Sequence, residues 1–203
     1  MNKMNELVVA TRNQGKIAEL QRLLFEHAPN LRLRSVSEFD LADVEETGTT
    51  FEENALLKAQ TIATLTGLPA LADDSGIAID ALNGAPGVFS ARWAGRHGDD
   101  AANIEKVLFE LQDVPVEQRG AQFVCVIAVA MPDGRNLTVR GELSGVVRFT
   151  PEGEFGFGYD PIFQPEGFTI TTAQMTPEQK DEISHRGKAL REIAPKIQPF
   201  IGL

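Results

Sequence analysis

The sequence has few of the features that mark secreted, membrane or nucleic-acid-binding proteins. Its one cysteine, Cys125, lies in the apolar run 123–130, so it cannot form an intramolecular disulfide and is predicted to be a small buried hydrophobe. The sequence has no apolar run of about 18 residues and no charged-then-apolar leader, and we therefore expect a cytoplasmic protein without a membrane span. Repeats, low-complexity segments and long linkers are also missing, which predicts one domain over residues 1–203.

Positive charge is scarce. The chain has 19 Lys and Arg against 29 Asp and Glu, giving a net charge of −10 at pH 7. A general binder of duplex nucleic acid needs a basic face that replaces the counterions on phosphate, so this class is excluded. A small anion can still bind where a few lysines converge, or where a divalent cation bridges it to carboxylates.

The stretch 69–82 carries the strongest candidate site. An apolar run, 69–72, predicts a short buried strand that ends at Asp73, Asp74 and Ser75. Gly76 then lets the chain turn, and residues 77–82 resume as a second alternating strand. Because side chains alternate along a strand, the two aspartates face opposite sides and only one can face a given pocket. The alternative is an exposed turn, since Asp, Ser and Gly are common turn residues.

The segment TRNQGK, residues 11–16, lies between a predicted strand, 6–10, and a predicted helix with apolar residues at helical spacing from 17 to 24. The first-turn amides of a helix have no helical partners and the helix dipole is positive there, so such a turn favours an anion. Thr11, Asn13 and Lys16 add a hydroxyl, an amide and a charge. The segment is not a Walker A loop, and an ordinary capped helix start is the alternative.

An acidic cluster, residues 40–46, precedes a helix that a capping box within residues 49–53 begins. Lys58 lies in or beside the apolar stripe of this helix, and a lysine turned toward a core needs an anionic partner. The helix leads directly into the Asp73-Asp74 strand, so Lys58 could reach the same pocket. The alternatives are a solvated acidic face and a lysine that snorkels at the edge of the stripe.

The C-terminal half combines predicted strands at 122–130, 137–141 and 145–149 with a glycine- and aromatic-rich segment, 153–163. Glycines among aromatic rings let a backbone approach a flat group such as a nucleobase, although a tight turn over a core is the alternative. A helix capped at Thr176 ends near His185 and Arg186, which place several donors side by side. A cationic pair at the end of a helix also arises from simple dipole complementarity.

Six segments of the sequence occur in the order and spacing of one known family. The segments are TRNQGK, EETGTTFEENALLKA, LADDSG, GAPGVFSARWAG, FGYDPIF and KDEISHR. Each motif alone is modest evidence, but six in order are specific. On these segments, the chain resembles the Ham1/RdgB-like inosine and xanthosine triphosphate pyrophosphatases, from Val8 to about Ala194.

The resemblance implies hydrolysis of ITP, dITP and XTP to the monophosphate and pyrophosphate, with Mg²⁺, by a cytoplasmic homodimer. It also implies an α/β fold with an elongated mixed sheet, helices around it and an active-site cleft between two lobes. Asp74 would be the catalytic carboxylate and a metal ligand, and Glu46, or Glu45 with a one-residue shift, would complete the metal site. The residues that would bind the substrate are Thr11, Arg12, Asn13, Gln14, Gly15, Lys16, Lys58, Ser75, Phe157, Gly158, Tyr159, Asp160, Lys180, His185 and Arg186.

The residues suit this chemistry independently of the resemblance. Water must attack a phosphorus surrounded by negative oxygens, so the site needs a cation and a base that orients the water. Donors from His185 or Arg186 would favour the 6-oxo group of hypoxanthine and xanthine over the 6-amino group of adenine. Two other functions stay open on sequence alone: a Maf-like pyrophosphatase with a different nucleotide preference, and a nucleotide sensor that does no chemistry.

Overall fold

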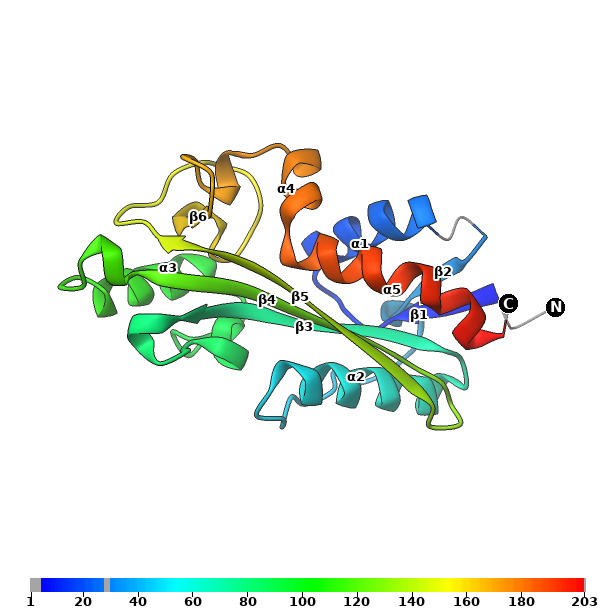
Figure 1. Cartoon of the computed structure of the whole chain (residues 1–203). Coiled ribbons are helices and arrows are strands. Elements are labelled where there is room, and N and C mark those ends of the chain that lie inside the picture. The colour runs from blue at the N-terminus through cyan, green and yellow to red at the C-terminus, as the bar shows by residue number, and fades with distance from the viewer. Residues whose placement is uncertain (1–4, 28–29, 203) are drawn as a thin grey trace. The chain divides into compact units, whose positions relative to one another are not determined.

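The structure is a computed structural model that describes residues 5–27 and 30–202. Within these residues it has a mixed α/β fold with a six-stranded sheet in the order β2-β1-β3-β4-β5-β6, flanked by helices (Figure 1), so the predicted fold class is confirmed. β1 pairs in parallel with β2 and β3, whereas β5 pairs antiparallel with β6. The strands are β1 (Glu6–Val9), β2 (Arg32–Ser35), β3 (Ala70–Ile79), β4 (Gly120–Ala130), β5 (Asn136–Val147) and β6 (Phe163–Pro165). The helices are α1 (Gln14–His27), α2 (Phe51–Thr66), α3 (Asp100–Glu110), α4 (Pro177–Ile183) and α5 (His185–Ile201).

The chain divides into two compact units. Unit 1 comprises Met1–Asp74, Cys125–Gly141 and Arg186–Leu203, and unit 2 comprises Ser75–Val124 and Glu142–His185. The strands β3, β4 and β5 therefore contribute residues to both units. A single domain over 1–203 and a cleft between two lobes stay predictions. None of the helices in the described part of the chain combines the length and apolar character that crossing a membrane requires.

The core of unit 1 follows from the alternation of its strands. Leu7 and Val9 of β1 and Leu71 of β3 point to one face and pack against Leu20 of α1 and Leu190 of α5. In Figure 1, α1 and α5 lie over this face and α2 lies over the other. Each face of unit 1 is therefore covered by its own helices.

The helix α2 begins as the sequence predicts. Thr50 is its N-cap, with its hydroxyl accepting from the Glu53 N–H and the Glu53 carboxylate accepting from the Thr50 N–H. The hydroxyl oxygen and the carboxylate oxygen each accept from an N–H group that has no partner within the helix. The helix ends at Gly67, whose φ of 65° is the left-handed conformation that glycine adopts without steric cost.

The core of unit 2 contains apolar residues from β3, α3, β5 and β6, among them Ile77, Val107, Val147 and Phe163. Asp99 caps α3 by accepting from the Ala102 N–H, which agrees with the predicted cap at Asp99 or Asp100. Two strand predictions were wrong in their extent, because each split a continuous strand at a glycine.

The first is β3, which runs unbroken from Ala70 to Ile79 and carries Asp73 and Asp74 in its middle rather than at its end. Gly76 was expected to turn the chain, but it instead allows a close approach. A Cβ at Gly76 would collide with the Ser90 hydroxyl and with the Gly87 carbonyl oxygen. The second is β5, where a Cβ at Gly145 would collide with the Gln164 carbonyl oxygen on the neighbouring β6.

The third difference concerns His185 and Arg186, which were expected at the end of a helix. They are the first two residues of α5, after α4 ends at Ile183. α5 continues to Ile201 and has Pro195 and Pro199 inside it, where proline is normally disfavoured. Dipole complementarity therefore does not explain this pair, since a helix start disfavours positive charge.

Candidate active site

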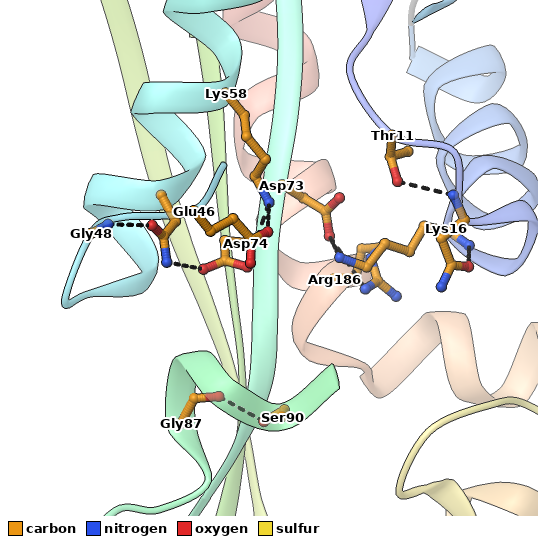
Figure 2. Close-up of polar contacts among 12 residues, drawn as sticks. Thr11, Lys16, Glu46, Gly48, Lys58, Asp73, Asp74, Gly87, Ser90 and Arg186 are labelled. Atoms are coloured by element: carbon orange, nitrogen blue, oxygen red, sulfur yellow. Dashed lines mark hydrogen bonds and ion pairs between the residues drawn. The ribbon is translucent and has the colours of Figure 1, made fainter. Parts of the chain in front are cut away.

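The middle of β3 places the two aspartates on opposite faces of the sheet. Asp73 follows Leu71 by two residues and so faces α1 and α5, whereas Asp74 follows Ala72 and faces α2. Figure 2 shows the two side chains leaving the strand in opposite directions. Asp73 is 2% exposed and Asp74 is 5% exposed, so both carboxylates need polar partners. The predicted alternation is confirmed.

Asp74 shares a lysine with the acidic loop that precedes α2. Lys58 Nζ lies 2.8 Å from Glu46 Oε1 and 3.5 Å from Asp74 Oδ1 (Figure 2). The predicted anionic partner of Lys58 is thus a pair of carboxylates from two segments that are distant in sequence. Glu46 is half-buried here, whereas the neighbouring Glu45 is exposed.

The charges in this group oppose one another. Burial raises the pKa of Asp74 and the nearby Glu46 raises it further, while Lys58 and Lys16 offset part of the effect, leaving the pKa above its ordinary value. For Lys58, burial lowers the pKa, but Asp74, Asp73 and Glu46 outweigh burial and raise it. The site therefore holds an ammonium group between carboxylates, one of which binds a proton more readily than an exposed aspartate does.

A buried amide joins the same group. Asn54, in the first turn of α2, donates from Nδ2 to Asp74 Oδ2 at 3.2 Å and accepts at Oδ1 from the Gly48 N–H at 2.8 Å. Sequence reasoning missed this residue. The available signal is a polar residue one helical turn after Phe51, on the buried side of a helix, where a side-chain amide needs partners.

On the opposite face, Asp73 binds two cations. Its Oδ2 atom lies 2.9 Å from Lys16 Nζ and 3.4 Å from Arg186 Nη2. Burial alone would raise the pKa of Asp73, but Lys16, Arg186 and Lys58 hold it well below its ordinary value. Sequence reasoning gave Asp73 no role, because nothing in the pattern indicates that cations from α1 and α5 converge on it.

The predicted anion turn is an ordered helix start. The Asn13 N–H donates to the Thr11 hydroxyl at 3.2 Å, and Asn13 Oδ1 accepts from the Lys16 N–H at 3.1 Å, as a helix cap does. Arg12 reaches the acidic loop instead, with its guanidinium 3.2 Å from Asp43 and within 2.5 Å of the Leu41 carbonyl oxygen. Gln14 and Gly15 are the first two residues of α1, and the surroundings of these two residues lie outside the described part of the chain.

The glycine- and aromatic-rich segment of unit 2 is held by its own aspartate. Asp160 is 2% exposed and accepts from Lys180 Nζ at 2.6 Å, from the Thr172 hydroxyl at 2.8 Å and from the Phe157 N–H at 2.8 Å. Lys180 Nζ also lies 4.9 Å from the centre of the Phe157 ring. The structure therefore brings together Phe157, Asp160 and Lys180, three of the residues that the resemblance implies for substrate binding.

The rest of this segment is tied to neighbouring loops of unit 2. Tyr159 is buried and donates its hydroxyl to the Ser90 carbonyl oxygen at 2.8 Å, and the Gly158 N–H donates to Asp100 Oδ2 at 2.7 Å.

Two other predicted site residues of unit 2 lie outside this segment. His185 is 7% exposed and stacks on the Phe123 ring with centroids 4.9 Å apart. Ser75, the first residue of unit 2, is half-buried.

Comparisons with known proteins agree with the order of the motifs. A model of the Ham1 family matches residues 7–196. The dITP/XTP pyrophosphatase of Streptomyces coelicolor is 53% identical over 200 residues, covering 98% of this chain and 100% of that protein. The dITP/XTP pyrophosphatase of Geobacter sulfurreducens is 51% identical, covering 92% of this chain and 94% of that protein.

Solved structures are similar over nearly the same length. A HAM1 protein from Coxiella burnetii has a TM-score of 0.86 at 45% identity, covering 96% of this chain and 98% of that one. The Staphylococcus aureus Ham1 protein has a TM-score of 0.85 at 43% identity, with the same coverage of the two chains.

Proposed function

Since the chain belongs to the Ham1 family, we propose that it is an enzyme that hydrolyses noncanonical purine nucleoside triphosphates, namely dITP, XTP and ITP, to the monophosphate and pyrophosphate. The observation that carries the proposal is the group on the α2 face of β3, where Asp74 and Glu46 both contact Lys58. Phosphoryl chemistry needs a base beside a cation, and this group holds a carboxylate next to an ammonium group, with a second carboxylate that suits a metal ion.

We propose Mg²⁺ as the cofactor, held by Asp74 and Glu46. Mg²⁺ prefers oxygen ligands and is usually bound through one or two carboxylates plus waters and substrate phosphates. The two carboxylates suit this ion because they already lie close enough to share one cation, the Lys58 ammonium. When bound, Mg²⁺ neutralises negative charge on the phosphate oxygens. Glu46 is preferred to Glu45 because the Glu45 side chain is exposed.

Asp74 is the proposed general base. A carboxylate whose pKa is raised by burial is a better proton acceptor than an exposed one, provided that it stays ionised at the working pH. Lys58 supports that ionised form and adds positive charge toward the phosphates. We place Ser75, the next residue, beside the substrate.

The start of α1 is the proposed triphosphate site. The amides of residues 13–16 and the positive end of the helix dipole favour an anion. Lys16 lies at this turn with its ammonium on Asp73, which fixes the charge near the helix start. At about 4 Å, one lysine and one phosphate oxygen attract by roughly 4 kcal/mol at an effective dielectric near 20, before desolvation. The proposed contacts are Thr11, Arg12, Asn13, Gln14, Gly15, Lys16 and Lys58.

We propose that the aromatic segment and three cationic residues named below recognise the base. Donors facing the purine 6-position accept hypoxanthine and xanthine and oppose the amino group of adenine, and sites of this kind discriminate by roughly 10⁴ to 10⁵. We also propose a cytoplasmic homodimer, for which sedimentation equilibrium of the whole chain is the direct measurement. The proposed base-site residues are Phe157, Gly158, Tyr159, Asp160, Lys180, His185 and Arg186.

The test is product analysis on a substrate panel. The purified chain with Mg²⁺ is given dITP, XTP, ITP, ATP and GTP, and ³¹P NMR separates pyrophosphate from orthophosphate. We expect pyrophosphate and a monophosphate from the first three substrates and much slower turnover of ATP. Equal rates on ATP and ITP would remove the base preference, and orthophosphate as the first product would remove the pyrophosphohydrolase assignment.

A further inference from the structure

Asn54 is a fully buried polar residue, 0% exposed, with no function assigned to it above. Its amide joins two segments that the proposed metal site needs. One end accepts from the Gly48 N–H, two residues after Glu46 in the acidic loop, and the other end donates to Asp74 on β3. Figure 2 places Gly48, Glu46 and Asp74 on this side of the strand, with Lys58 beside the two carboxylates.

The two partners of Asn54 fix the orientation of its amide. A backbone N–H can only donate and an ionised carboxylate can only accept, so Oδ1 must face Gly48 and Nδ2 must face Asp74. An aspartate here would place an oxygen against Asp74, and a leucine would satisfy neither partner. Among side chains of this size, only asparagine serves both ends of the bridge.

Gly48 allows the loop to approach this amide closely. A Cβ at Gly48 would lie 2.7 Å from Asn54 Oδ1 and 2.7 Å from the Glu53 Cβ, closer than real Cβ atoms come to other atoms. The loop is held at the next residue too, because the Thr49 N–H donates to Glu53 Oε2 at 2.7 Å. The end of the loop that carries Glu46 is therefore fixed to α2 at adjoining positions.

The bridge also sets the rotation of the Asp74 carboxylate. Oδ2 receives the Asn54 amide, whereas Oδ1 is the oxygen that lies 3.5 Å from Lys58 Nζ. Because the two oxygens have different partners, the carboxylate keeps one orientation relative to the Glu46 loop. Groups that orient metal-binding side chains in this way affect metal affinity without contacting the ion.

We propose that Asn54 is a positioning residue that holds Glu46 and Asp74 at the separation and orientation required to bind one divalent cation together. The inference rests on the proposed function, since it concerns the same carboxylates. The proposed role requires no contact of Asn54 with the substrate or the ion. It acts through Gly48 on the loop side and through the Asp74 carboxylate on the strand side.

The experiment measures Mn²⁺ binding by EPR on the whole chain without nucleotide, and kcat and KM for dITP as functions of Mg²⁺ concentration. For Asn54→Leu we expect Mn²⁺ affinity to fall by about 10 to 100-fold and the Mg²⁺ concentration for half-maximal rate to rise by a similar factor. The KM for dITP at saturating Mg²⁺ should change much less, because the side-chain hydrogen bonds of Asn54 go to Gly48 and Asp74 and to none of the residues proposed to bind the triphosphate or the base.

Asn103→Leu is the matched control. Asn103 is also a buried helix asparagine, 1% exposed, whose Oδ1 accepts from the Ala94 N–H at 2.7 Å and whose Nδ2 donates to the Ala91 carbonyl oxygen at 3.4 Å. Asn103→Leu also removes the two hydrogen bonds of a buried side-chain amide, but neither of these bonds goes to a carboxylate. Both variants should unfold at lower temperature than the wild type, and only Asn54→Leu should lose metal affinity.

Gly48→Ala tests the loop side of the bridge and decides the matter if Asn54→Leu does not fold. The added Cβ should push the loop away from Asn54 and weaken Mn²⁺ binding while Asp74 stays in place. Wild-type Mn²⁺ affinity in folded Asn54→Leu, or in Gly48→Ala when Asn54→Leu is unfolded, would overturn the inference. Failure of the wild-type chain to hydrolyse any triphosphate would instead overturn the proposed function, and the Mn²⁺ comparison could still be read.

Discussion

Replacing Asp73 with Asn removes the carboxylate that Lys16 and Arg186 share. At an effective dielectric near 20, the contacts of 2.9 and 3.4 Å correspond to about 6 and about 5 kcal/mol of attraction before desolvation. Most of this attraction offsets the cost of removing the charges from water. The change in the free energy of unfolding therefore reports the cost of leaving Lys16 and Arg186 without this carboxylate. Breaking a buried ion pair from one side costs about 3 to 5 kcal/mol, and we expect Asp73→Asn to lower the free energy of unfolding by that amount.

The loss should depend on pH in a defined direction. The pKa of Asp73 in the folded chain is held below its ordinary value, which is about 3.9 in the unfolded chain. A depressed folded-state pKa stabilises the fold above the unfolded pKa, and this contribution is lost as pH falls toward the folded value. The difference between wild type and Asp73→Asn should therefore be full at pH 7 and shrink below about pH 4.

Urea unfolding followed by circular dichroism, at a series of pH values from 7 down to 3, measures both effects. Asp133→Asn is the matched control, because Asp133 makes a 2.9 Å contact with Arg135 while both side chains are more than half exposed, at 54% and 58%. We expect no resolvable change for that exposed pair. A difference for Asp73→Asn below about 1 kcal/mol at pH 7, which is near the range of surface substitutions, or one that stays constant with pH, would refute the reasoning.

Four further predictions concern the α2 face of β3. Asp74→Asn should reduce dITP turnover by about 10² to 10⁴-fold, as loss of a general base does, and near-wild-type turnover would remove Asp74 from the chemistry. Chelation by EDTA should stop pyrophosphate release and added Mg²⁺ should restore it, so a rate unaffected by EDTA would exclude the proposed cofactor. Lys58→Met removes the cation that Glu46 and Asp74 share, and calorimetry should show a lower unfolding temperature without metal and a larger rise on adding Mg²⁺ than in the wild type. Thr50→Ala removes the N-cap of α2 and should cost about 0.5 to 2 kcal/mol in urea unfolding, a range typical of lost caps, so an unchanged midpoint would contradict it.

Local rules predicted the parts of the site that depend on neighbouring residues alone. Strand alternation separated Asp73 from Asp74, and the pattern within residues 49–53 predicted the capping box that opens α2. The position of Lys58 in an apolar stripe predicted an anionic partner, which exists. Strand alternation, helical spacing and a helix cap each depend on residues within about two helical turns of one another, so these inferences needed no information about tertiary contacts.

The remaining features depend on contacts between distant segments. Gly76 has the same sequence signature whether it turns the chain or lets Ser90 approach, and only the fold distinguishes the two. Arg186 opens a helix instead of ending one, and its carboxylate partner, Asp73, lies 113 residues earlier. Asn54 likewise joins residues 6 and 20 positions away. Sequence periodicity contains no information about such pairings.

The pKa directions of adjacent aspartates follow from this same arrangement. Asp73 and Asp74 are chemically identical and both buried, yet the pKa of one is lowered and that of the other is raised. The difference comes from the face of β3: Asp73 meets two cations from α1 and α5, while Asp74 meets one lysine that Glu46 also uses. Carboxylates whose environments separate their pKa values serve different roles. Asp73 therefore stays ionised as the countercharge of Lys16 and Arg186, so Asp73→Asn should lower stability and also disturb these two proposed substrate contacts. Asp74 is the carboxylate proposed to accept a proton, so Asp74→Asn should act mainly on rate.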